Sequence, residues 1–250
     1  MLPYGGRHHH TSVPNSPAIE CKGLTVHHRG QLEPALVDIW LKIPRGAAVA
    51  LVGANGAGKS TLLKTIAGLL TPSSGTISVL GQERGNCFHR VSYLPQRSEI
   101  DWHFPISLEE LVLMGRYVHL GWFQSPTKED HEKAAWAINE LNLFNLKNRQ
   151  IGELSGGQQQ RALLARCLIQ DSVILLLDEP LNAVDAETVS IIQNVLKHQL
   201  KMGKTILMAT HDVDRIDNPF DGVLFLHQGR EVQPPHAFNY PIKIGKESFA

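Results

Sequence analysis

A glycine-rich segment that ends in a lysine and two hydroxyl residues is the part of this sequence best suited to bind phosphate. It reads Gly53-Ala54-Asn55-Gly56-Ala57-Gly58-Lys59-Ser60, which fits the pattern GxxxxGK[ST], and Thr61 follows it. Glycines let the backbone curl until several N–H groups point at one phosphate, and a helix that begins at Lys59 adds the positive end of its dipole. We expect Lys59 to reach the β- and γ-phosphates of ATP, Ser60 to bind the Mg²⁺ that bridges them, and Thr61 to support the α-phosphate.

Two carboxylates at the end of an apolar run are the second candidate group. Asp178 and Glu179 follow the buried-strand pattern of Val173 to Leu177, and open α/β sheets bind ligands at the carboxyl ends of their strands. Asp178 suits a place at the Mg²⁺, whereas Glu179 suits a general base, or a water-positioning group, for attack on the γ-phosphate. Alone, the pair is equally typical of a strand that meets solvent. Beside a phosphate loop, it completes the set of groups that hydrolysis requires.

The elements around these residues predict an α/β fold. Short β-compatible runs indicate an opening antiparallel piece at Ile19 to Val26 and Leu36 to Ile43, and a buried strand at Ala47 to Val52. A helix is expected directly after the phosphate loop, from Lys59 to Leu70. The remaining expected elements are strands at Thr76 to Leu80, Val91 to Leu94, Val173 to Leu177, Thr205 to Ala209 and Val223 to Leu226, and a helix at Ala186 to Leu200.

A helical pattern replaces the strand pattern between about Ser107 and Ala165. Ser107, Thr127 and Ser155 stand where a hydroxyl can cap the exposed amides of a helix. We interpret residues 97–165 as an inserted helical subdomain between two parts of a nucleotide-binding core, 18–96 and 166–250. Residues 1–17 are rich in Pro, Gly, Ser and His, and we expect them to form a disordered tail.

Composition limits the classes of function that are open to this chain of 250 residues. Lysine plus arginine and aspartate plus glutamate number 24 each, so no overall field attracts the chain to nucleic acid or to an anionic membrane. The apolar runs are far shorter than the ~20 residues that cross a bilayer, and the start of the chain lacks the apolar stretch of a secretory signal. The three cysteines and thirteen histidines are dispersed, without the spacing of a disulfide framework or a metal site.

The most specific segment is Leu154-Ser155-Gly156-Gly157-Gln158, which resembles the LSGGQ signature of ABC ATPases. Ser155 and the bare amides of the two glycines open a predicted helix and offer a second cradle for a γ-phosphate. A serine-capped helix followed by a glutamine patch is the plainer interpretation of this segment alone. The resemblance covers roughly residues 19 to 230. It implies the ABC ATPase fold, a P-loop NTPase core with a mixed sheet, an N-terminal antiparallel β piece and an inserted helical subdomain.

The same resemblance assigns further residues to the site. Gln96 matches the Q-loop glutamine, which touches the Mg²⁺ or the attacking water, and His211 matches the switch histidine near the γ-phosphate. The segment Leu181 to Asp185 matches the D-loop. The catalytic set implied in this way is Lys59, Gln96, Glu179 and His211, and the Mg²⁺ ligands are Ser60, Gln96 and Asp178. In this family the signature completes the site of the opposite subunit, which implies a homodimer that holds two ATP molecules, contacted in trans by Ser155, Gly156, Gly157, Gln158 and Asp185.

Two positions depart from the family pattern. The aromatic residue that usually stacks on adenine is replaced by His28, preceded by His27, so His28 is the candidate adenine contact. The D-loop also lacks the commoner Ser-Ala-Leu-Asp sequence, although Asp185 is retained.

The segment from Tyr93 to Tyr117 resembles the manganese, zinc and iron branch of ABC importers, especially in Asp101-Trp102, Phe104-Pro105 and Met114-Gly115-Arg116. This resemblance implies that residues 97–120 contact an integral membrane permease at the cytoplasmic face of the membrane, with an extracellular substrate-binding protein as an indirect partner. Manganese ranks first as cargo, zinc second and chelated iron third. Alternatively, Trp102 and Phe104 only anchor the helical subdomain.

Two competing classes of function have weaker support. A non-transport ABC ATPase that acts on nucleic acid or ribosomes usually carries two ATPase units, a long coiled coil or a basic arm, and the sequence shows none of these. A nucleotide-regulated adaptor without turnover is disfavoured because Glu179 and His211 are both present.

Overall fold

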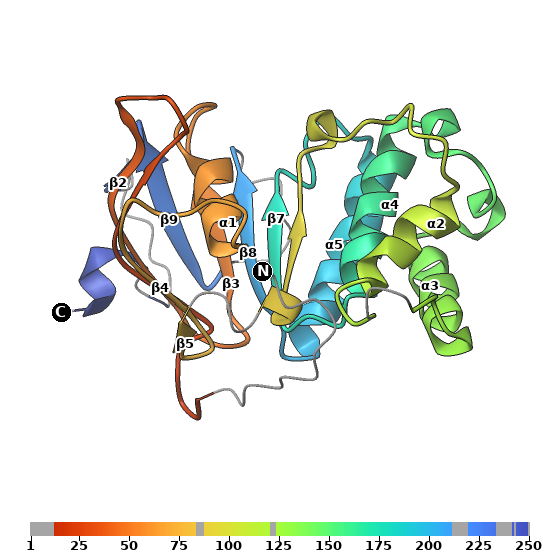
Figure 1. Ribbon diagram of the computed structural model, residues 1–250, viewed down its shortest axis with the longest axis horizontal. Coiled ribbons are helices and arrows are strands. Elements are labelled where there is room, and N and C mark those ends of the chain that lie inside the picture. Colours follow the sequence, from red (N-terminus) through yellow and green to blue (C-terminus); the bar gives the residue numbers. More distant parts are fainter. Residues whose placement is uncertain are drawn as a thin grey trace.

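The computed structural model describes residues 13–83, 88–120, 124–211, 220–233, 242 and 244–249. Its first layer is an antiparallel sheet of four strands in the order β2-β1-β4-β5 (Figure 1). The strands are β1 (Ile19–His27), β2 (Pro34–Ile43), β4 (Ser74–Val79) and β5 (Gln82–Glu83). The pairing of β1 with β2 is antiparallel, with Ile19 opposite Ile43, which confirms the predicted opening piece.

The second layer is a sheet of six strands in the order β10-β9-β3-β8-β7-β6. These are β3 (Ala48–Val52), β6 (Val91–Leu94), β7 (Ile174–Asp178), β8 (Thr205–Thr210), β9 (Gly222–His227) and β10 (Arg230–Val232). Five of the six strands pair in parallel, and only β10 runs antiparallel to its neighbour β9. Because parallel strands end at the same edge, the residues that follow β3, β6, β7 and β8 come together there.

The six-stranded sheet is buried on both faces, as its apolar strands predict. Ile174 and Leu176 of β7 belong to a core shared with the antiparallel sheet and with helix α1 (Lys59–Ile66). Leu175 and Leu177 point to the other face, into a core shared with helices α4 (Gly156–Leu168) and α5 (Ala186–Lys201). This alternation along one strand holds its carboxyl end in a fixed position between two packed layers.

The helical pattern forms helices at the predicted starts. Helix α2 (Leu108–Leu113) begins after Ser107, α3 (Lys128–Glu140) after Thr127, and α4 after Ser155. Each hydroxyl accepts a hydrogen bond from the backbone amide three residues on, and each helix has a complete capping box. Helices α2, α3 and α4 gather on the side of the six-stranded sheet away from the antiparallel sheet (Figure 1). Short 3-10 turns occupy Phe88–Arg90, Arg97–Glu99, Met114–Arg116, Phe144–Leu146, Ile151–Glu153 and Lys246–Phe249.

Helix α1 ends at Ile66, earlier than the predicted end at Leu70. The cause is Gly68, whose φ of 84° lies in the left-handed region that commonly terminates a helix. The amide of Leu69 then donates to the carbonyl of Lys64 at 2.8 Å, which caps the last turn. The predicted helix was therefore too long, because the apolar pattern continues past Gly68 although the helix does not.

Arg116 of the Met-Gly-Arg motif joins the helical segment to the core. Its guanidinium pairs with Asp130 at 2.6 Å and with Asp171 at 2.9 Å, and donates to the carbonyl of Ile169 at 2.9 Å. Burial opposes ionisation of Asp130, but hydrogen bonds from Thr127 and Arg116 outweigh it and lower the pKa of that carboxyl to about 2. The motif therefore has a clear structural role.

Most of the expected N-terminal tail, residues 1–12, lies outside the described residues. Residues 13–17 are described, and the amide of Val13 donates to the carbonyl of Leu80 at 3.1 Å. The division into core 18–96 and 166–250 and helical subdomain 97–165 stays a prediction.

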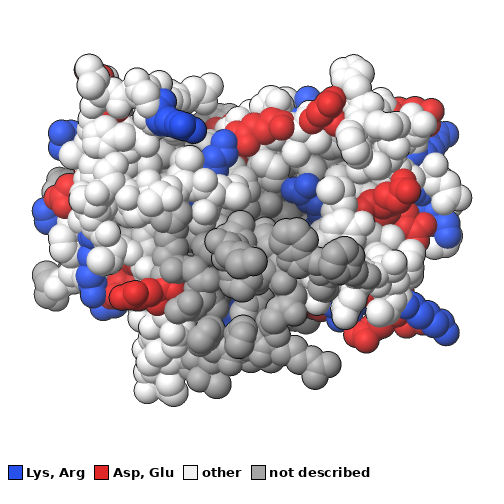
Figure 2. All heavy atoms as spheres, viewed as in Figure 1, with Lys and Arg blue, Asp and Glu red and all other residues white. Residues whose placement is uncertain are grey.

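The surface carries both signs of charge. Figure 2 shows acidic and basic side chains interspersed over the described part of one face, which agrees with the equal numbers of each in the sequence. Within the described ranges, no helix combines the length and the apolar character that crossing a bilayer requires.

Candidate functional site

The phosphate loop connects β3 to α1 at the carboxyl edge of the parallel strands. Gly58 caps α1 with a φ of 101°, and a Cβ at this position would lie 2.6 Å from the Leu36 side chain. A side chain at Gly53 would meet the backbone carbonyl of Leu226. Glycine is therefore required at both positions, at Gly58 for the conformation and at Gly53 for the close approach of a neighbouring strand.

Lys59 lies folded over this loop. Its Nζ donates to the carbonyls of Gly53 at 2.8 Å and Ala54 at 3.2 Å, and it pairs with Glu179 at 3.3 Å. The Lys59 and Glu179 side chains are only 4% and 7% exposed, so this ion pair is shielded from water. If Lys59 bound a γ-phosphate, the lysine would exchange its carboxylate partner for a phosphate partner.

Ser60, Gln96 and Asp178 meet at one point, as the sequence predicts. The Gln96 amide donates to the Ser60 hydroxyl at 3.3 Å and to the Asp178 carboxylate at 3.4 Å, and the Tyr93 hydroxyl donates to Asp178 at 3.2 Å. Burial raises the pKa of Asp178, against the opposing effect of hydrogen bonds from Ser60, Gln96 and Tyr93. Asp178 is fully buried, and no lysine or arginine of the described chain pairs with it. Oxygen ligands around a buried and unneutralised carboxylate fit a hard divalent cation such as Mg²⁺.

Glu179 follows Asp178 in an unusual backbone conformation. Its φ of 50° lies in the left-handed region, where a residue other than glycine carries strain. Its carboxylate is bound by Lys59 through one oxygen and by the Asn182 amide, at 3.1 Å, through the other. The carboxylate is thus held between the phosphate loop and the D-loop.

The two predicted histidines lie at different edges of the site. His28 places its Nε2 3.3 Å from the hydroxyl of Thr61, so it contacts the phosphate loop that it is expected to flank. His211 directly follows β8 and lies in a small pocket with Glu179 and Asn182. These contacts test neither the adenine-stacking role of His28 nor the switch role of His211, and both roles stay predictions.

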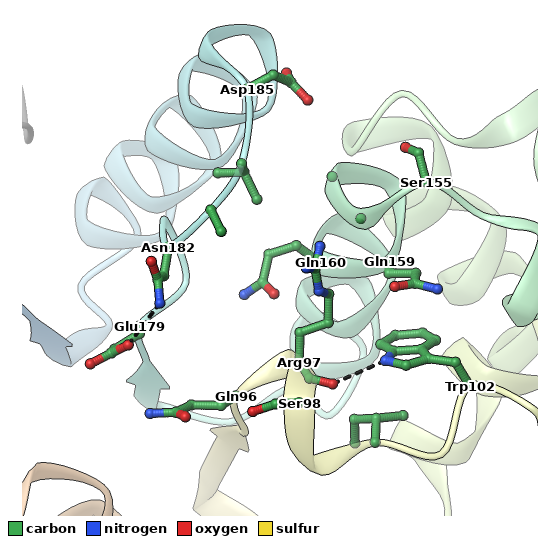
Figure 3. Close-up of a pocket in the computed structure, with 15 residues that line it drawn as sticks. Gln96, Arg97, Ser98, Trp102, Ser155, Gln159, Gln160, Glu179, Asn182 and Asp185 are labelled. Carbon is green, nitrogen blue, oxygen red and sulfur yellow. Dashed lines mark hydrogen bonds between the residues drawn. The ribbon is translucent and has the colours of Figure 1, made fainter. Parts of the chain in front are cut away.

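The signature residues line a cleft that the phosphate loop does not line. The cleft has a volume of about 780 Å³, and its walls are the Q-loop, the signature and the D-loop, with Glu179 among the lining residues (Figure 3). None of the phosphate-loop residues lines it. In Figure 3, Ser155 at the start of α4 and Asp185 at the start of α5 lie at the upper end of the view, and Glu179 and Gln96 lie at the lower end. Direct contacts join Lys59 to Glu179 and Gln96 to Ser60 and Asp178, whereas the signature shares only the cleft with Gln96 and Glu179.

Glycines also set the position of the signature. A Cβ at Gly157 would lie 2.5 Å from the Thr188 hydroxyl and 2.9 Å from the Asp185 carboxylate, so only glycine lets α4 begin against the start of α5. A Cβ at Gly156 would overlap the guanidinium of Arg97. Arg97 directly follows Gln96, and Figure 3 shows it extending from the Q-loop toward α4.

The large apolar side chains of the segment 97–120 divide into two groups. Trp102 packs against the core and donates from its indole to the carbonyl of Arg97 at 3.0 Å, which fits the anchoring interpretation. Phe104, Met114 and Tyr117 are 55%, 42% and 50% exposed, which fits a docking surface. The two interpretations thus apply to different residues.

Sequence reasoning missed three contacts at this site, made by Tyr93, Arg97 and the Asn182 side chain. Tyr93 is 85 positions from its partner Asp178, so no local pattern connects them. Asn182 lies within the segment Leu181 to Asp185 that matches the D-loop, and its spacing of three residues from Glu179 was the available signal.

A phosphate loop, a buried carboxylate suited to Mg²⁺ and a second carboxylate at one sheet edge define a P-loop ATPase. The ABC transporter family model matches residues 36–182. The zinc transport system ATP-binding protein TroB of Treponema pallidum is 45% identical over 210 residues, which cover 84% of this chain and 78% of that protein. The manganese transport system ATP-binding protein MntB of Bacillus subtilis is 43% identical over 210 residues, which cover 84% and 83%.

A solved structure agrees with these sequence matches. The dimeric ATP-binding cassette MJ0796, in a post-hydrolysis state bound to ADP and Pi, has a TM-score of 0.76 and 25% identity, and the match covers 86% of this chain and 97% of that one. The chain belongs to the ABC transporter family, as one of its ATP-binding and ATP-hydrolysing subunits. The predicted fold class is confirmed, and the comparisons support the transport function over the nucleic-acid alternative.

Proposed function

We propose that two copies of this chain bind two ATP molecules between them and drive a membrane permease that imports manganese or zinc. The observation that carries the dimer is that the signature lines a cleft to which the phosphate loop of the same chain contributes no residue, so each half of a γ-phosphate site lacks its counterpart there. The dimeric state of MJ0796 supports the same assembly. The metal is proposed from the zinc and manganese relatives TroB and MntB.

ATP would bind at the edge where Gly58 opens α1. The loop amides and the dipole of α1 would hold the β-phosphate, and Lys59 would leave Glu179 for the β- and γ-phosphates. Thr61 and His28, which already touch, would face the α-phosphate and the adenine. The signature of the second subunit, Ser155 to Gln158, would close over the γ-phosphate, with Asp185 beside it.

Ser60, Gln96 and Asp178 are the residues that would hold Mg²⁺. When bound, the ion would neutralise charge on the β- and γ-phosphates. Glu179, released from Lys59, would orient a water molecule and accept its proton as the water oxygen attacks the γ-phosphorus and the bond to the leaving ADP oxygen breaks. His211 would stabilise the γ-phosphate from the end of β8.

The exposed side chains Phe104, Met114 and Tyr117 would form the surface that meets the permease on the cytoplasmic face of the membrane. This placement makes the chain a peripheral membrane subunit. An extracellular binding protein would deliver the metal to the permease and would not touch this chain.

Complementation between two inactive variants tests the shared site. Lys59→Ala damages the phosphate loop, whereas Ser155→Asp keeps a capping oxygen for α4 but sets a negative charge against the γ-phosphate. Each variant alone should lack turnover, yet an equal mixture should regain it, because a mixed dimer has one site with an intact loop and an intact signature. Released phosphate is the measurement.

The matched control is a mixture of Lys59→Ala with Glu179→Gln. Both lesions lie on the phosphate-loop side, so a mixed dimer has no intact site and should stay inactive. If the first mixture is no more active than the control mixture, the two motifs do not act across a dimer interface.

Metal uptake by cells tests the cargo. Cells that lack this gene should accumulate less radioactive manganese, or less zinc, than cells that carry it, and the wild-type chain should restore uptake of that metal. A Lys59→Ala chain, expressed to the same level, should not restore it. Normal uptake of both metals in the deleted cells would refute the proposed cargo without affecting the ATPase.

A further inference from the structure

The carboxylate of Glu179 is held from both sides. Lys59 Nζ lies 3.3 Å from Oε1. The Asn182 side-chain amide donates to Oε2 at 3.1 Å (Figure 3). The Glu179 side chain is 7% exposed, so it is largely shielded from water. One carboxylate oxygen is therefore tied to the phosphate loop and the other to the D-loop.

The backbone places Asn182 where it can make this contact. The backbone amide of Asn182 donates to the backbone carbonyl of Glu179 at 3.2 Å and closes a turn through Pro180. Left-handed φ values at Glu179 and at Ala183, 50° and 52°, bend the chain on both sides of this turn. Such values cost energy outside glycine and persist where the surroundings enforce them. The turn returns the Asn182 side chain to the carboxylate that precedes it.

We propose that Asn182 is a positioning residue for the hydrolysis of ATP, acting through Glu179. The proposal rests on the proposed role of Glu179. When Lys59 moves to the triphosphate, Oε1 loses its partner and becomes free to accept a proton from water, whereas the bond from Asn182 to Oε2 can remain. A neutral amide fixes the orientation of the carboxylate without adding a positive charge that would weaken it as a base.

Asn182 is also placed to connect Glu179 with the cleft. It is exposed, and it lines the cleft together with Ala183, Val184 and Asp185. A second subunit that closed the cleft would therefore meet the same loop that orients the carboxylate. Asn182 would then contact both the second subunit and the carboxylate of Glu179.

Steady-state kinetics of Asn182→Ala test the proposal. Loss of one orienting hydrogen bond should lower kcat about tenfold, with KM for ATP changed by less than about twofold, because the substituted residue contacts Glu179 and not the phosphate loop. Asn182→Asp has the same size but cannot donate, and it should lose at least as much. Asn194→Ala, an exposed asparagine on α5, should keep wild-type kinetics.

A double-mutant comparison separates positioning from a general structural effect. In a Glu179→Gln background, single-turnover hydrolysis should be equally slow with and without the Asn182→Ala substitution, because the carboxylate that Asn182 holds is gone. Unchanged kcat in Asn182→Ala, or the same tenfold loss in the Glu179→Gln background, would overturn the proposal. If Glu179→Gln hydrolysed ATP as fast as the wild-type chain, the role of Glu179 itself would be refuted instead.

Discussion

Glu179→Gln should bind ATP normally and lose nearly all turnover. Glutamine fills the same space but cannot accept a proton from water, and removal of a general base costs roughly 10²- to 10⁴-fold in rate. The substitution also removes the negative partner of Lys59, which lies 3.3 Å away, so the lysine becomes more available to the triphosphate. The variant should therefore hold ATP for long periods.

Gel filtration with Mg-ATP is the measurement. Glu179→Gln should elute as a stable dimer in the presence of Mg-ATP and as a smaller species without it. Glu187→Gln, at an exposed position in the first turn of α5, is the control and should behave as wild type. A monomeric Glu179→Gln chain that turns over ATP at the wild-type rate would contradict the catalytic role.

Lys59→Ala should weaken nucleotide binding itself. Hydrogen bonds to charged groups contribute roughly 1.5–3 kcal/mol, so the loss of Lys59 should raise the Kd for ATP about 10- to 100-fold. The buried carboxylate of Glu179 would also lose its cation, and the approach of a triphosphate would then bring two unneutralised negative groups together.

Titration with a fluorescent ATP analogue checks this expectation. AMP binding should change less than ATP binding, because Lys59 is assigned to the β- and γ-phosphates. Lys201→Ala, an exposed lysine at the end of α5, is the control for the loss of a positive charge. Equal affinity of Lys59→Ala and wild type for ATP would remove Lys59 from its assigned place.

The two substitutions should differ in a diagnostic way. Both should abolish turnover, but only Lys59→Ala should lose affinity, and only Glu179→Gln should accumulate an ATP-bound dimer. This contrast follows from the position of each residue, since Lys59 lies on the phosphate loop and Glu179 at the end of β7.

The parts of this fold that could be predicted from the sequence are those with short-range causes. Capping hydroxyls at Ser107, Thr127 and Ser155 marked three helix starts, because a cap and the backbone amide that it binds are only three residues apart. The order of β3, loop and α1 followed from the phosphate-loop pattern. The end of α1 was wrong because the left-handed conformation of Gly68 outweighed a continuing apolar pattern.

The contacts between distant segments could not be predicted in the same way. Asp178 was identifiable as the end of a buried strand, but its bond to Tyr93 depends on β6 lying beside β7, a pairing between segments some 80 residues apart. The approach of Arg97 to Gly156 depends likewise on the packing of the Q-loop against α4. These contacts follow from the topology of the sheet and leave no periodic trace in the sequence.

The missing side chain of Gly157 has a mechanical consequence. Since α4 begins in contact with Thr188 and Asp185, the first turns of α4 and α5 interlock, and neither can slide past the other without breaking that fit. A rotation that carries Ser155 toward a neighbouring molecule must then carry Asp185 with it. The segment that leads back from Asp185 to Glu179 contains Asn182, so a methyl group at residue 157 that displaced Asp185 would also disturb the loop that holds the Glu179 carboxylate.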